Sequence, residues 1–344
     1  MKKELIKKIN HLILWYRHVI KNKNNQKLNI YNKFLALKHS FSNDFFVMYN
    51  LNKKNIKDYI SEYERYLSRE IDGDYKILLD NKIIFTQYFS NFISIPKIII
   101  MILEDGEIYD QQGSKISQDD ILKIMKNKKM IIKPINDGGG HGVHIFEEQN
   151  GIYYLDFEKI SKEKLIETII NSKNCIVNEY VKQAKYAEKI FSKTVNTIRI
   201  ITIKDPETNR FIIPCAVHRF GNIKTKGVDN ASSGGYVTEI NIESGKLGYT
   251  KSLRDLISKE EHPDTGIRIK DTKIPNWEKT KKSLIDVAEK FPYLPFIAWD
   301  VVITEDSFVI LEANASCSLE LFQIFGTIKN TKLGKFYKYH KIIK

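Results

Sequence analysis

Apolar positions in the first 75 residues recur every three or four places, which is the period of an amphipathic helix. Three segments have this period, at residues 5–16, 31–40 and 55–67. A turn signal at Asp72-Gly73-Asp74 follows the third of them. We therefore predict a helical N-terminal region over residues 1–75.

The period changes after residue 76, where short apolar runs of strand length mix irregularly with helical segments. The predicted strands are 97–103, 130–133, 143–147, 152–155, 175–181, 196–203, 211–217, 236–242, 296–303 and 307–312. The predicted helices are 82–92, 117–126, 161–171 and 276–291, and 77–79 is either a short strand or the start of a helix. This order indicates a mixed α+β fold, because a doubly wound sheet would alternate regularly.

The composition is typical of an ordered globular protein with more than one domain. The chain has 344 residues, of which 42% are hydrophobic. The longest apolar stretch near the start, residues 11–20, is too short and too polar to cross a bilayer, and no signal peptide is recognisable. Cys175, Cys215 and Cys317 are far apart and form no CxxC pair, which fits a reducing compartment. We therefore predict a cytoplasmic protein.

The net charge of +13 has two interpretations. It reflects either an anionic partner or a general preference for lysine, asparagine and isoleucine. Basic residues crowd the first helix and recur every third position in the tail, residues 329–344. These ends form either a contact with the inner membrane surface or solvated helix faces. We predict no specific nucleic-acid partner, and the oligomeric state does not follow from the sequence.

A glycine-rich loop follows the predicted strand 130–133. Its glycines allow a backbone to approach a polyphosphate, and Lys133 adds a positive charge beside it. Such loops also occur as plain turns. The sequence is neither a P-loop nor a dinucleotide-binding fingerprint. The loop contains Gly138, Gly139, Gly140, His141 and Gly142.

Two carboxylates and an amide lie on the last predicted hairpin. Adjacent antiparallel strands would place Asp300 beside Glu312, with Asn314 two residues on and on the same face. These oxygen ligands suit Mg²⁺, with Mn²⁺ as the alternative. A surface hairpin with solvated acids is the other interpretation. The apolar flanking residues favour the metal site.

A second group of polar residues accompanies the strands that begin at residues 196 and 211. Arg199 lies within an apolar strand and needs an anionic partner, which is either a phosphate or a structural carboxylate. Arg219 follows the next strand, and Asn230 precedes the Gly234-Gly235 turn. The end of strand 175–181 can bind an adenine edge through its backbone.

Taken in order, these features resemble the sugar-transfer-associated branch of the ATP-grasp superfamily, which is related to α-L-glutamate ligases. The resemblance covers residues 80–325 and implies two α+β lobes that clasp ATP. In chain order, it is carried by Asn81-Lys82, Phe85, Ile95-Pro96-Lys97, Lys133-Pro134, 137–143, 179–181, 195–199, Arg219, Asp229-Asn230, Gly234-Gly235, 262–266, 274–277, Trp299-Asp300 and Glu312-Ala313-Asn314.

The resemblance implies a role for each site residue. Lys82 and Lys133 resemble the lysines that hold the nucleotide phosphates, and the glycine loop resembles a flap over them. The adenine hinge would comprise Glu179, Tyr180 and Val181. The metal ligands would be Asp300, Glu312 and Asn314. The residues that steady the transferred phosphoryl group would be Arg199, Arg219 and Asn230.

The resemblance also implies an activity and a division of the chain. We expect an N-terminal lobe at 76–185, a C-terminal lobe at 186–328 and a basic tail at 329–344. The expected reaction is ATP-dependent amide formation through an acyl-phosphate, with small-molecule or sugar-linked carboxylate and amine substrates from cell-surface polysaccharide synthesis. The helical N-terminal region departs from relatives that begin with an α/β domain, so their substrates do not carry over. Gln183 and Glu188 are both candidates for the ribose-binding residue.

Three other function classes use some of these features. A small-molecule kinase would also need a glycine loop, a lysine and Mg²⁺, but His218-Arg219-Phe220 lacks the aspartate of a kinase catalytic loop. A non-catalytic ATP-binding scaffold would bind ATP without turnover. A nucleic-acid-binding protein, which the charge alone suggests, would show steeply salt-dependent binding.

Overall fold

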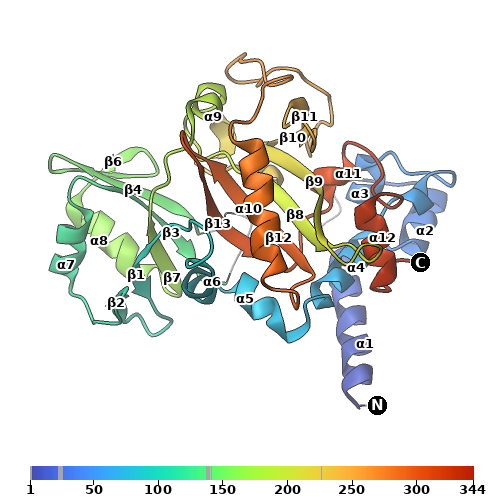
Figure 1. Ribbon diagram of the computed structural model, residues 1–344, viewed down its shortest axis with the longest axis horizontal. Helices are drawn as coiled ribbons and strands as arrows, with labels where there is room; N and C mark the ends of the chain where they lie inside the picture. Colours follow the sequence, from blue (N-terminus) through green and yellow to red (C-terminus); the bar gives the residue numbers. More distant parts are fainter. Residues whose placement is uncertain (1, 22–25, 137–139, 141, 226) are drawn as a thin grey trace.

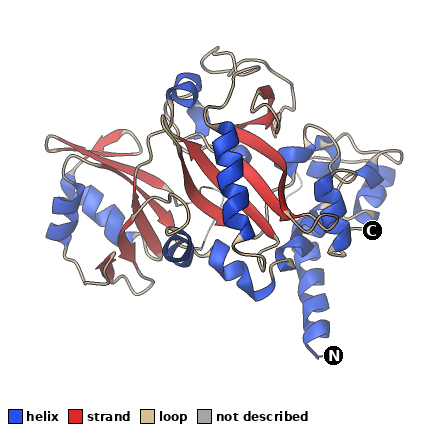
Figure 2. Ribbon diagram, viewed as in Figure 1, coloured by secondary structure: helices blue, strands red, loops and turns tan. Residues whose placement is uncertain are grey.

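The computed structural model describes residues 2–21, 26–136, 140, 142–225 and 227–344 (Figure 1). Helices and two antiparallel sheets make up these residues (Figure 2), which confirms the α+β prediction. One sheet and its helices lie at the left of Figure 1. The second sheet lies at the centre, with the N-terminal and C-terminal helices beyond it on the right.

The first sheet has the strand order β2-β1-β7-β3-β4-β5-β6. Helices α7 (Gln118–Met125) and α8 (Lys162–Asn171) supply Ile121 and Leu165 to its core, where both are fully buried. Its strands are β1 (Ile98–Ile102), β2 (Ile108–Asp110), β3 (Lys129–Pro134), β4 (His144–Gln149), β5 (Ile152–Leu155), β6 (Glu158–Ile160) and β7 (Cys175–Glu179).

The second sheet has the strand order β11-β10-β9-β8-β12-β13. Its strands are β8 (Ile198–Lys204), β9 (Phe211–Phe220), β10 (Tyr236–Ile240), β11 (Leu247–Ser252), β12 (Phe296–Ile303) and β13 (Phe308–Asn314). Strand β9 continues three residues further than predicted, so Arg219 lies within the strand rather than after it. Pairing with β10 up to Tyr236 maintains this extra length.

Both faces of the second sheet are buried, because successive strand residues enter different cores. Ile198 and Ile200 pack with α10 (Trp277–Glu289), α5 (Ile77–Asp80) and α6 (Lys82–Phe89). Ile201 and Ile203 pack on the other face. The elements there include α2 (Ile30–Lys38), α3 (Asn43–Met48), α11 (Glu320–Gln323) and α12 (Lys332–Tyr339).

The N-terminal region is helical, as predicted, but segment 55–67 is not one helix. It contains η2 (Ile56–Asp58) and α4 (Glu62–Leu67). Ser61 begins the second helix with a capping box, in which its hydroxyl accepts from the Glu64 backbone and Glu64 accepts from the Ser61 backbone. The remaining elements here are α1 (Lys2–Trp15), its continuation η1 (Tyr16–Ile20), η3 (Ser68–Glu70) and η4 (Gly73–Lys76).

Several short elements were not predicted, and they lie at edges or in connections. Strands β2, β6 and β11 are three of the four edge strands of the two sheets, and segment 77–79 is helical. Other unpredicted elements are α9 (Lys185–Ile190), η5 (Ile223–Thr225), η6 (Ala231–Ser233) and the C-terminal helices α11 and α12. Within the described residues, no helix combines the length and the apolar character needed to cross a bilayer.

Candidate active site

A cavity of about 630 Å³ lies between the two sheets, and the N-terminal helices close one end of it. Its lining residues come from both sheets, from α4 to α6 and from the segment after β13. The cavity brings together twelve of the residues singled out from the sequence. They are Lys82, Lys133, Gly140, Glu179, Tyr180, Val181, Arg199, Arg219, Asn230, Asp300, Glu312 and Asn314.

The remaining predicted residues belong to the glycine loop. Gly138, Gly139 and His141 lie outside the described residues. Gly142 is exposed and does not line the cavity. Gly140 does line it with a φ of +76°, a backbone conformation that glycine adopts without strain.

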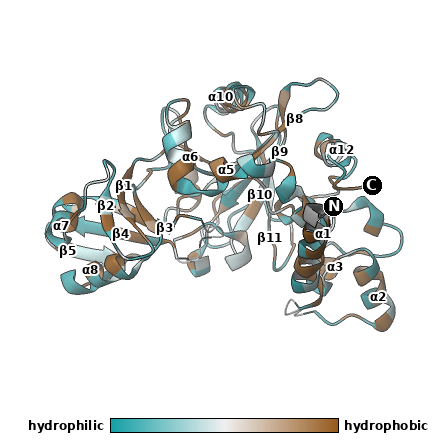
Figure 3. Cartoon of the chain, turned by 90° about the horizontal axis from the view of Figure 1, so that it is seen from below, coloured by the Kyte–Doolittle hydropathy of each residue, from teal (hydrophilic) through white to brown (hydrophobic). Residues whose placement is uncertain are grey.

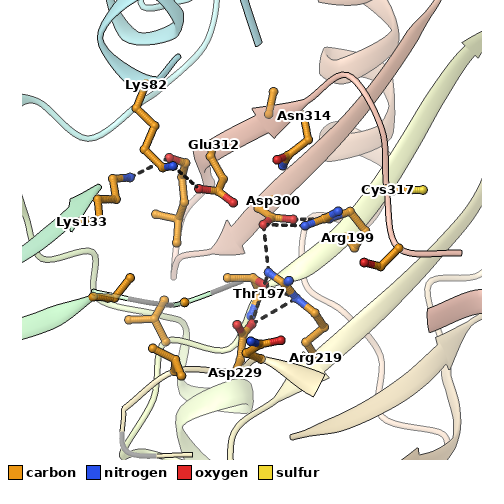
Figure 4. Close-up of a pocket in the computed structure, with 18 of the residues that line it drawn as sticks. Lys82, Lys133, Thr197, Arg199, Arg219, Asp229, Asp300, Glu312, Asn314 and Cys317 are labelled. Atoms are coloured by element: carbon orange, nitrogen blue, oxygen red, sulfur yellow. Dashed lines mark hydrogen bonds and ion pairs between the residues drawn. The ribbon is translucent and has the colours of Figure 1, made fainter. Parts of the chain in front are cut away.

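Two lysines from separate elements meet at the last strand of the second sheet (Figure 4). Lys82 is the first residue of α6, and its backbone N–H donates to the Ile135 carbonyl, 3.1 Å away, just past β3. That bond holds the start of α6 beside the end of β3, which carries Lys133. The Lys82 Nζ lies 3.4 Å from Glu312 Oε2, and the Lys133 Nζ donates to the Leu311 carbonyl at 3.0 Å.

The protonation of Lys133 is sensitive to this environment. Burial and the neighbouring Lys82 together lower its pKa to about 8, although Glu312 opposes the decrease. Lys133 is therefore charged at neutral pH but loses its proton more readily than an exposed lysine.

Asp300 forms the centre of a row of charged residues across three neighbouring strands. Register pairs it with Arg199 of β8 on one side and with Glu312 of β13 on the other. The hairpin prediction that Asp300 and Glu312 lie side by side is confirmed. Both Asp300 oxygens accept from the Arg199 guanidinium, and Arg219 donates to Oδ2 at 3.0 Å. In this structure the anionic partner of Arg199 is thus a protein carboxylate.

These arginines determine the charge state of Asp300. Burial would raise its pKa, but Arg199 and Arg219 outweigh burial and bring the pKa down to about 2. Asp300 is therefore a carboxylate at neutral pH, which a metal ligand must be.

The donor set fits an ion that prefers oxygen ligands. Glu312 and Asn314 line the cavity from the same strand, and the buried Asn314 Nδ2 has no hydrogen-bond partner in the described structure. No group of three His, Cys, Asp or Glu side chains among the described residues could hold a metal by itself. An ion here would need the Asn314 oxygen and the free lone pairs of Asp300 alongside Glu312.

The end of β7 forms another wall of the cavity. Glu179 is the last residue of β7, and Tyr180 and Val181 follow it. The Lys129 ammonium lies 4.3 Å from the Tyr180 ring centroid, which helps to fix that ring. The neighbouring Asn178 also lines the cavity, and its buried Oδ1 has no partner within the described residues.

Neither candidate for the ribose-binding residue lines the cavity. Gln183 is buried and donates to the Phe191 and Thr194 carbonyls, while its Oε1 accepts from Asn196. These bonds give Gln183 a structural role. Glu188 lies in α9, outside the cavity lining.

Sequence reasoning missed two polar residues beside Arg219. Thr197 Oγ1 accepts from the Arg219 Nε at 2.9 Å, and Asp229 Oδ2 lies 3.4 Å from the same nitrogen. Asp229 also accepts from the Thr197 backbone at 2.8 Å, so the three side chains hold one another. Asp229 is one of the residues that carry the family resemblance, next to Asn230, but no sequence pattern indicated that it would contact Arg219.

Comparisons with known proteins identify the fold. A model of the sugar-transfer associated ATP-grasp family matches residues 61–333, most of the chain. No curated protein matches the sequence. The family match confirms the resemblance stated from the sequence and the ATP-grasp fold.

Several solved structures are similar to this chain at low identity. D-alanine–D-alanine ligase from Helicobacter pylori has 12% identity over 78% of this chain and 62% of its own, with a TM-score of 0.42. N5-carboxyaminoimidazole ribonucleotide synthetase from Thermotoga maritima has 8% identity over 78% and 50%, with a TM-score of 0.41. The ATP-grasp ligase PsnB, complexed with a phosphomimetic precursor variant, Mg and ADP, has 11% identity over 71% and 52%, with a TM-score of 0.37. The chain thus spans about half to three fifths of these proteins.

Proposed function

Because the chain belongs to the sugar-transfer-associated ATP-grasp family, we propose that it is an ATP-dependent ligase that joins a carboxylate to an amine. The observation that carries this proposal is the meeting of Lys82 and Lys133 at Glu312, beside Asp300 and its two arginines, in one cavity between the lobes. Phosphoryl transfer from ATP needs this combination of cations and oxygen ligands.

The reaction proceeds in two steps. A substrate carboxylate oxygen attacks the γ-phosphorus of ATP, the bond from that phosphorus to the β–γ bridging oxygen breaks, and ADP leaves. The product of this step is an acyl-phosphate. An amine then attacks the acyl carbon, phosphate leaves with the electron pair of the carbon–oxygen bond, and the amine proton passes to solvent.

The protein contributes position and charge. Lys82 and Lys133 hold the β- and γ-phosphates, and Arg199 and Arg219 stabilise the charge on the transferred group. Mg²⁺, or Mn²⁺ in its place, would be held by Asp300, Glu312 and Asn314 and would neutralise the β- and γ-phosphate oxygens. Asn230, which lines the cavity and accepts from the Ser232 backbone, is the third residue of the phosphoryl-transfer group.

Arg199 and Arg219 can bind the transferred phosphate only if their ion pairs with Asp300 weaken. Both guanidinium groups point at Asp300 (Figure 4). Asp300 would hold both arginines less strongly if its oxygens also held a metal ion. The arginines would then be available to a phosphate, which would replace Asp300 as their anionic partner.

We also propose that one substrate is sugar-linked and that the enzyme works in the cytoplasm. The family's association with sugar transfer supports the first point. The three free cysteines, two buried and one half-buried, support the second. Cell-surface polysaccharide synthesis is the pathway class that would combine the two.

The test is a screen for phosphate release with ATP, Mg²⁺ and pairs of sugar acids and amines, with products identified by mass spectrometry. We expect phosphate and an amide in equal amounts, and release that is roughly 100-fold slower or more from Glu312→Gln. Phosphate retained on an acceptor would instead identify a phosphotransferase. Tight ATP binding without turnover in any pair would favour a scaffold.

A further inference from the structure

The cavity extends past the proposed phosphate site to a wall that neither sheet supplies. Arg65 of α4, Arg69 of η3 and Lys76 of η4 line this end from the N-terminal region. Ser316 and Ser318, which follow β13, line it as well. No sequence pattern had singled out these residues.

This end is continuous with the charged row on the second sheet, and Cys317 provides the link. Cys317, Arg65 and Arg199 all line the cavity, and the two arginines oppose the increase that burial causes in the pKa of the Cys317 thiol. Arg199 holds Asp300, and Cys317 lies three residues after Asn314. The basic wall therefore adjoins the place where the acyl-phosphate would form.

The two arginines of this wall lie against an aromatic ring. Their guanidinium carbons lie 4.5 Å and 5.3 Å from the centroid of the Tyr66 ring, which they share. Neither forms an ion pair with any residue that the structure describes, although Glu320 is near enough to raise the pKa of Arg65 against the effect of burial. An arginine fork positioned in this way can bind a carboxylate or phosphate through two hydrogen bonds.

We propose that this wall, formed by Arg65 and Arg69, binds an anionic group of the substrate that reacts with ATP or with the acyl-phosphate. The inference rests on the proposed function and adds the chemical class of the substrate: it carries a carboxylate or phosphate beyond the reacting group. The ATP phosphates have their own cations, Lys82 and Lys133, so the second basic wall serves a second anion.

Isothermal titration calorimetry can test the wall with two simple probes, inorganic phosphate and glucuronate. Each is titrated into protein saturated with Mg-AMPPNP, which blocks the nucleotide phosphate site. The variants are Arg69→Gln, which changes an exposed residue, and Arg65→Gln with Arg69→Gln. The control is Lys279→Gln with Lys282→Gln, which removes two exposed charges of α10, outside the cavity.

We expect at least one probe to bind the wild type and the control equally, about tenfold more weakly to Arg69→Gln, and not measurably to the double variant. The affected probe distinguishes a phosphate from a carboxylate. Absence of binding, or equal binding to all proteins, would overturn the proposal. The titrations are repeated without nucleotide, so that a protein unable to bind AMPPNP contradicts the proposed ligase while the wall is still tested.

A separate feature concerns α1, which extends away from the rest of the molecule (Figure 1). Its apolar stripe faces solvent: Leu5 is 60% exposed and Leu12 63%. The same stripe continues through Ile6, Ile9, Ile13, Tyr16 and Ile20, all at least 39% exposed. Figure 3 shows the hydrophobic colouring along this helix. An amphipathic helix normally turns this stripe toward the core, so its exposure indicates a partner.

The charge around the stripe indicates which partner. Residues 1–33 contain nine lysines and arginines and one glutamate. This segment thus carries +8 of the chain's net charge of +13. The other basic end does not share this character. In α12, Phe336 and Tyr337 are fully buried, and Lys332 and Lys335 pair with Glu207.

We infer that α1 docks on an anionic lipid surface, with its apolar stripe in the boundary between headgroups and acyl chains. The helix contacts α4, and Glu70 beside it directly follows Arg69 of the basic wall. Docking would thus bring the basic end of the cavity close to the membrane.

Vesicle sedimentation tests this inference with the full chain. We expect binding to vesicles of phosphatidylcholine with phosphatidylserine and at least tenfold weaker binding to pure phosphatidylcholine. Leu5→Gln with Leu12→Gln should lose the binding, while Ile257→Gln, at another exposed apolar residue, should retain it. Equal binding by the α1 variant would overturn the inference. So would a dimer, seen by light scattering, that the α1 substitutions dissociate, because a second copy would then cover the stripe.

Discussion

At the scale of single residues, burial and neighbouring charges set the charge of each group in the cavity. The same burial has opposite consequences for an acid and a base. It lowers the pKa of Lys133 to about 8, whereas two arginines hold Asp300 ionised despite it. The cavity therefore has a cation that titrates near physiological pH beside an anion that does not.

The first prediction concerns the pH dependence of ATP binding. Lys133 is protonated below its pKa of about 8 and neutral above it, so its attraction for phosphate is present at pH 7 and is lost as the pH rises. We expect ATP affinity to fall about tenfold between pH 7 and pH 9. Calorimetry across this range measures it, and binding above pH 8 should take up a proton.

The matched control is Lys133→Arg, because arginine keeps its charge throughout this range. Its ATP affinity should change much less between pH 7 and pH 9. An identical decrease in both proteins would show that another group causes it.

The second prediction is that the two acids of the proposed metal site, Asp300 and Glu312, differ in their contribution to stability. Asp300→Asn leaves the buried Arg199 and Arg219 with one anion fewer, so we expect unfolding free energy to fall by about 3–5 kcal/mol. The Glu312 side chain is 21% exposed, and Glu312→Gln should cost much less stability. Both variants should lose activity roughly 100-fold or more.

Chemical denaturation and phosphate release measure these two effects on the same proteins. Glu312→Gln is the cleaner probe of the metal, because its fold should survive. Near-normal activity in Glu312→Gln would remove the metal assignment.

At the scale of elements, the site depends on where apolar packing ends on one face of the second sheet. On β8, Ile201 and Ile203 pack under α12 and the N-terminal helices, while Arg199 on the same face meets Asp300 instead. The helices on that face thus support the strands that carry the charged row. Helix α12 is part of this support, although the basic tail had two other interpretations in the sequence.

The third prediction tests the contribution of α12. Phe336 is fully buried against Phe296 of β12, with ring centroids 6.2 Å apart. Phe336→Ala should therefore reduce the unfolding free energy by about 3–5 kcal/mol. Lys335→Gln removes only an exposed ion pair with Glu207 and should change it by less than about 1 kcal/mol. Urea denaturation of both variants measures the difference.

At the scale of the whole molecule, residues of both sheets and of the N-terminal region line the same cavity. Lys133 belongs to the first sheet and Glu312 to the second, and Arg65 belongs to the N-terminal region. A nucleotide bound between Lys133 and Glu312 would connect the two sheets, and a substrate at Arg65 would add the N-terminal region.

The fourth prediction follows from this arrangement. Mg-AMPPNP at 100 times its dissociation constant should stabilise the protein by about 2.7 kcal/mol, since it binds only the folded state. Thermal unfolding measures the gain. Lys133→Ala should lose most of it at the same nucleotide concentration, whereas the surface variant Lys282→Gln should retain it. An equal gain in Lys133→Ala would mean that the nucleotide binds elsewhere.

The sequence by itself determined the strands that carry the charged row and the pairing of Asp300 with Glu312. Both follow from local rules, because a short hairpin fixes its own register and side chains alternate along each strand. The helical character of the N-terminal region was also readable from its period. The break at Ser61 was missed, because the apolar spacing continues through it while the capping box interrupts the backbone.

Only the tertiary structure decided what meets across long distances in the chain. Arg199 and Asp300 are 101 residues apart, and Arg65 is further still from Cys317. Such contacts depend on how whole elements pack. The outward stripe of α1 and the buried helix α12 show the same limit. Both helices are amphipathic in sequence, but the period of a helix does not say whether another surface is present to cover it.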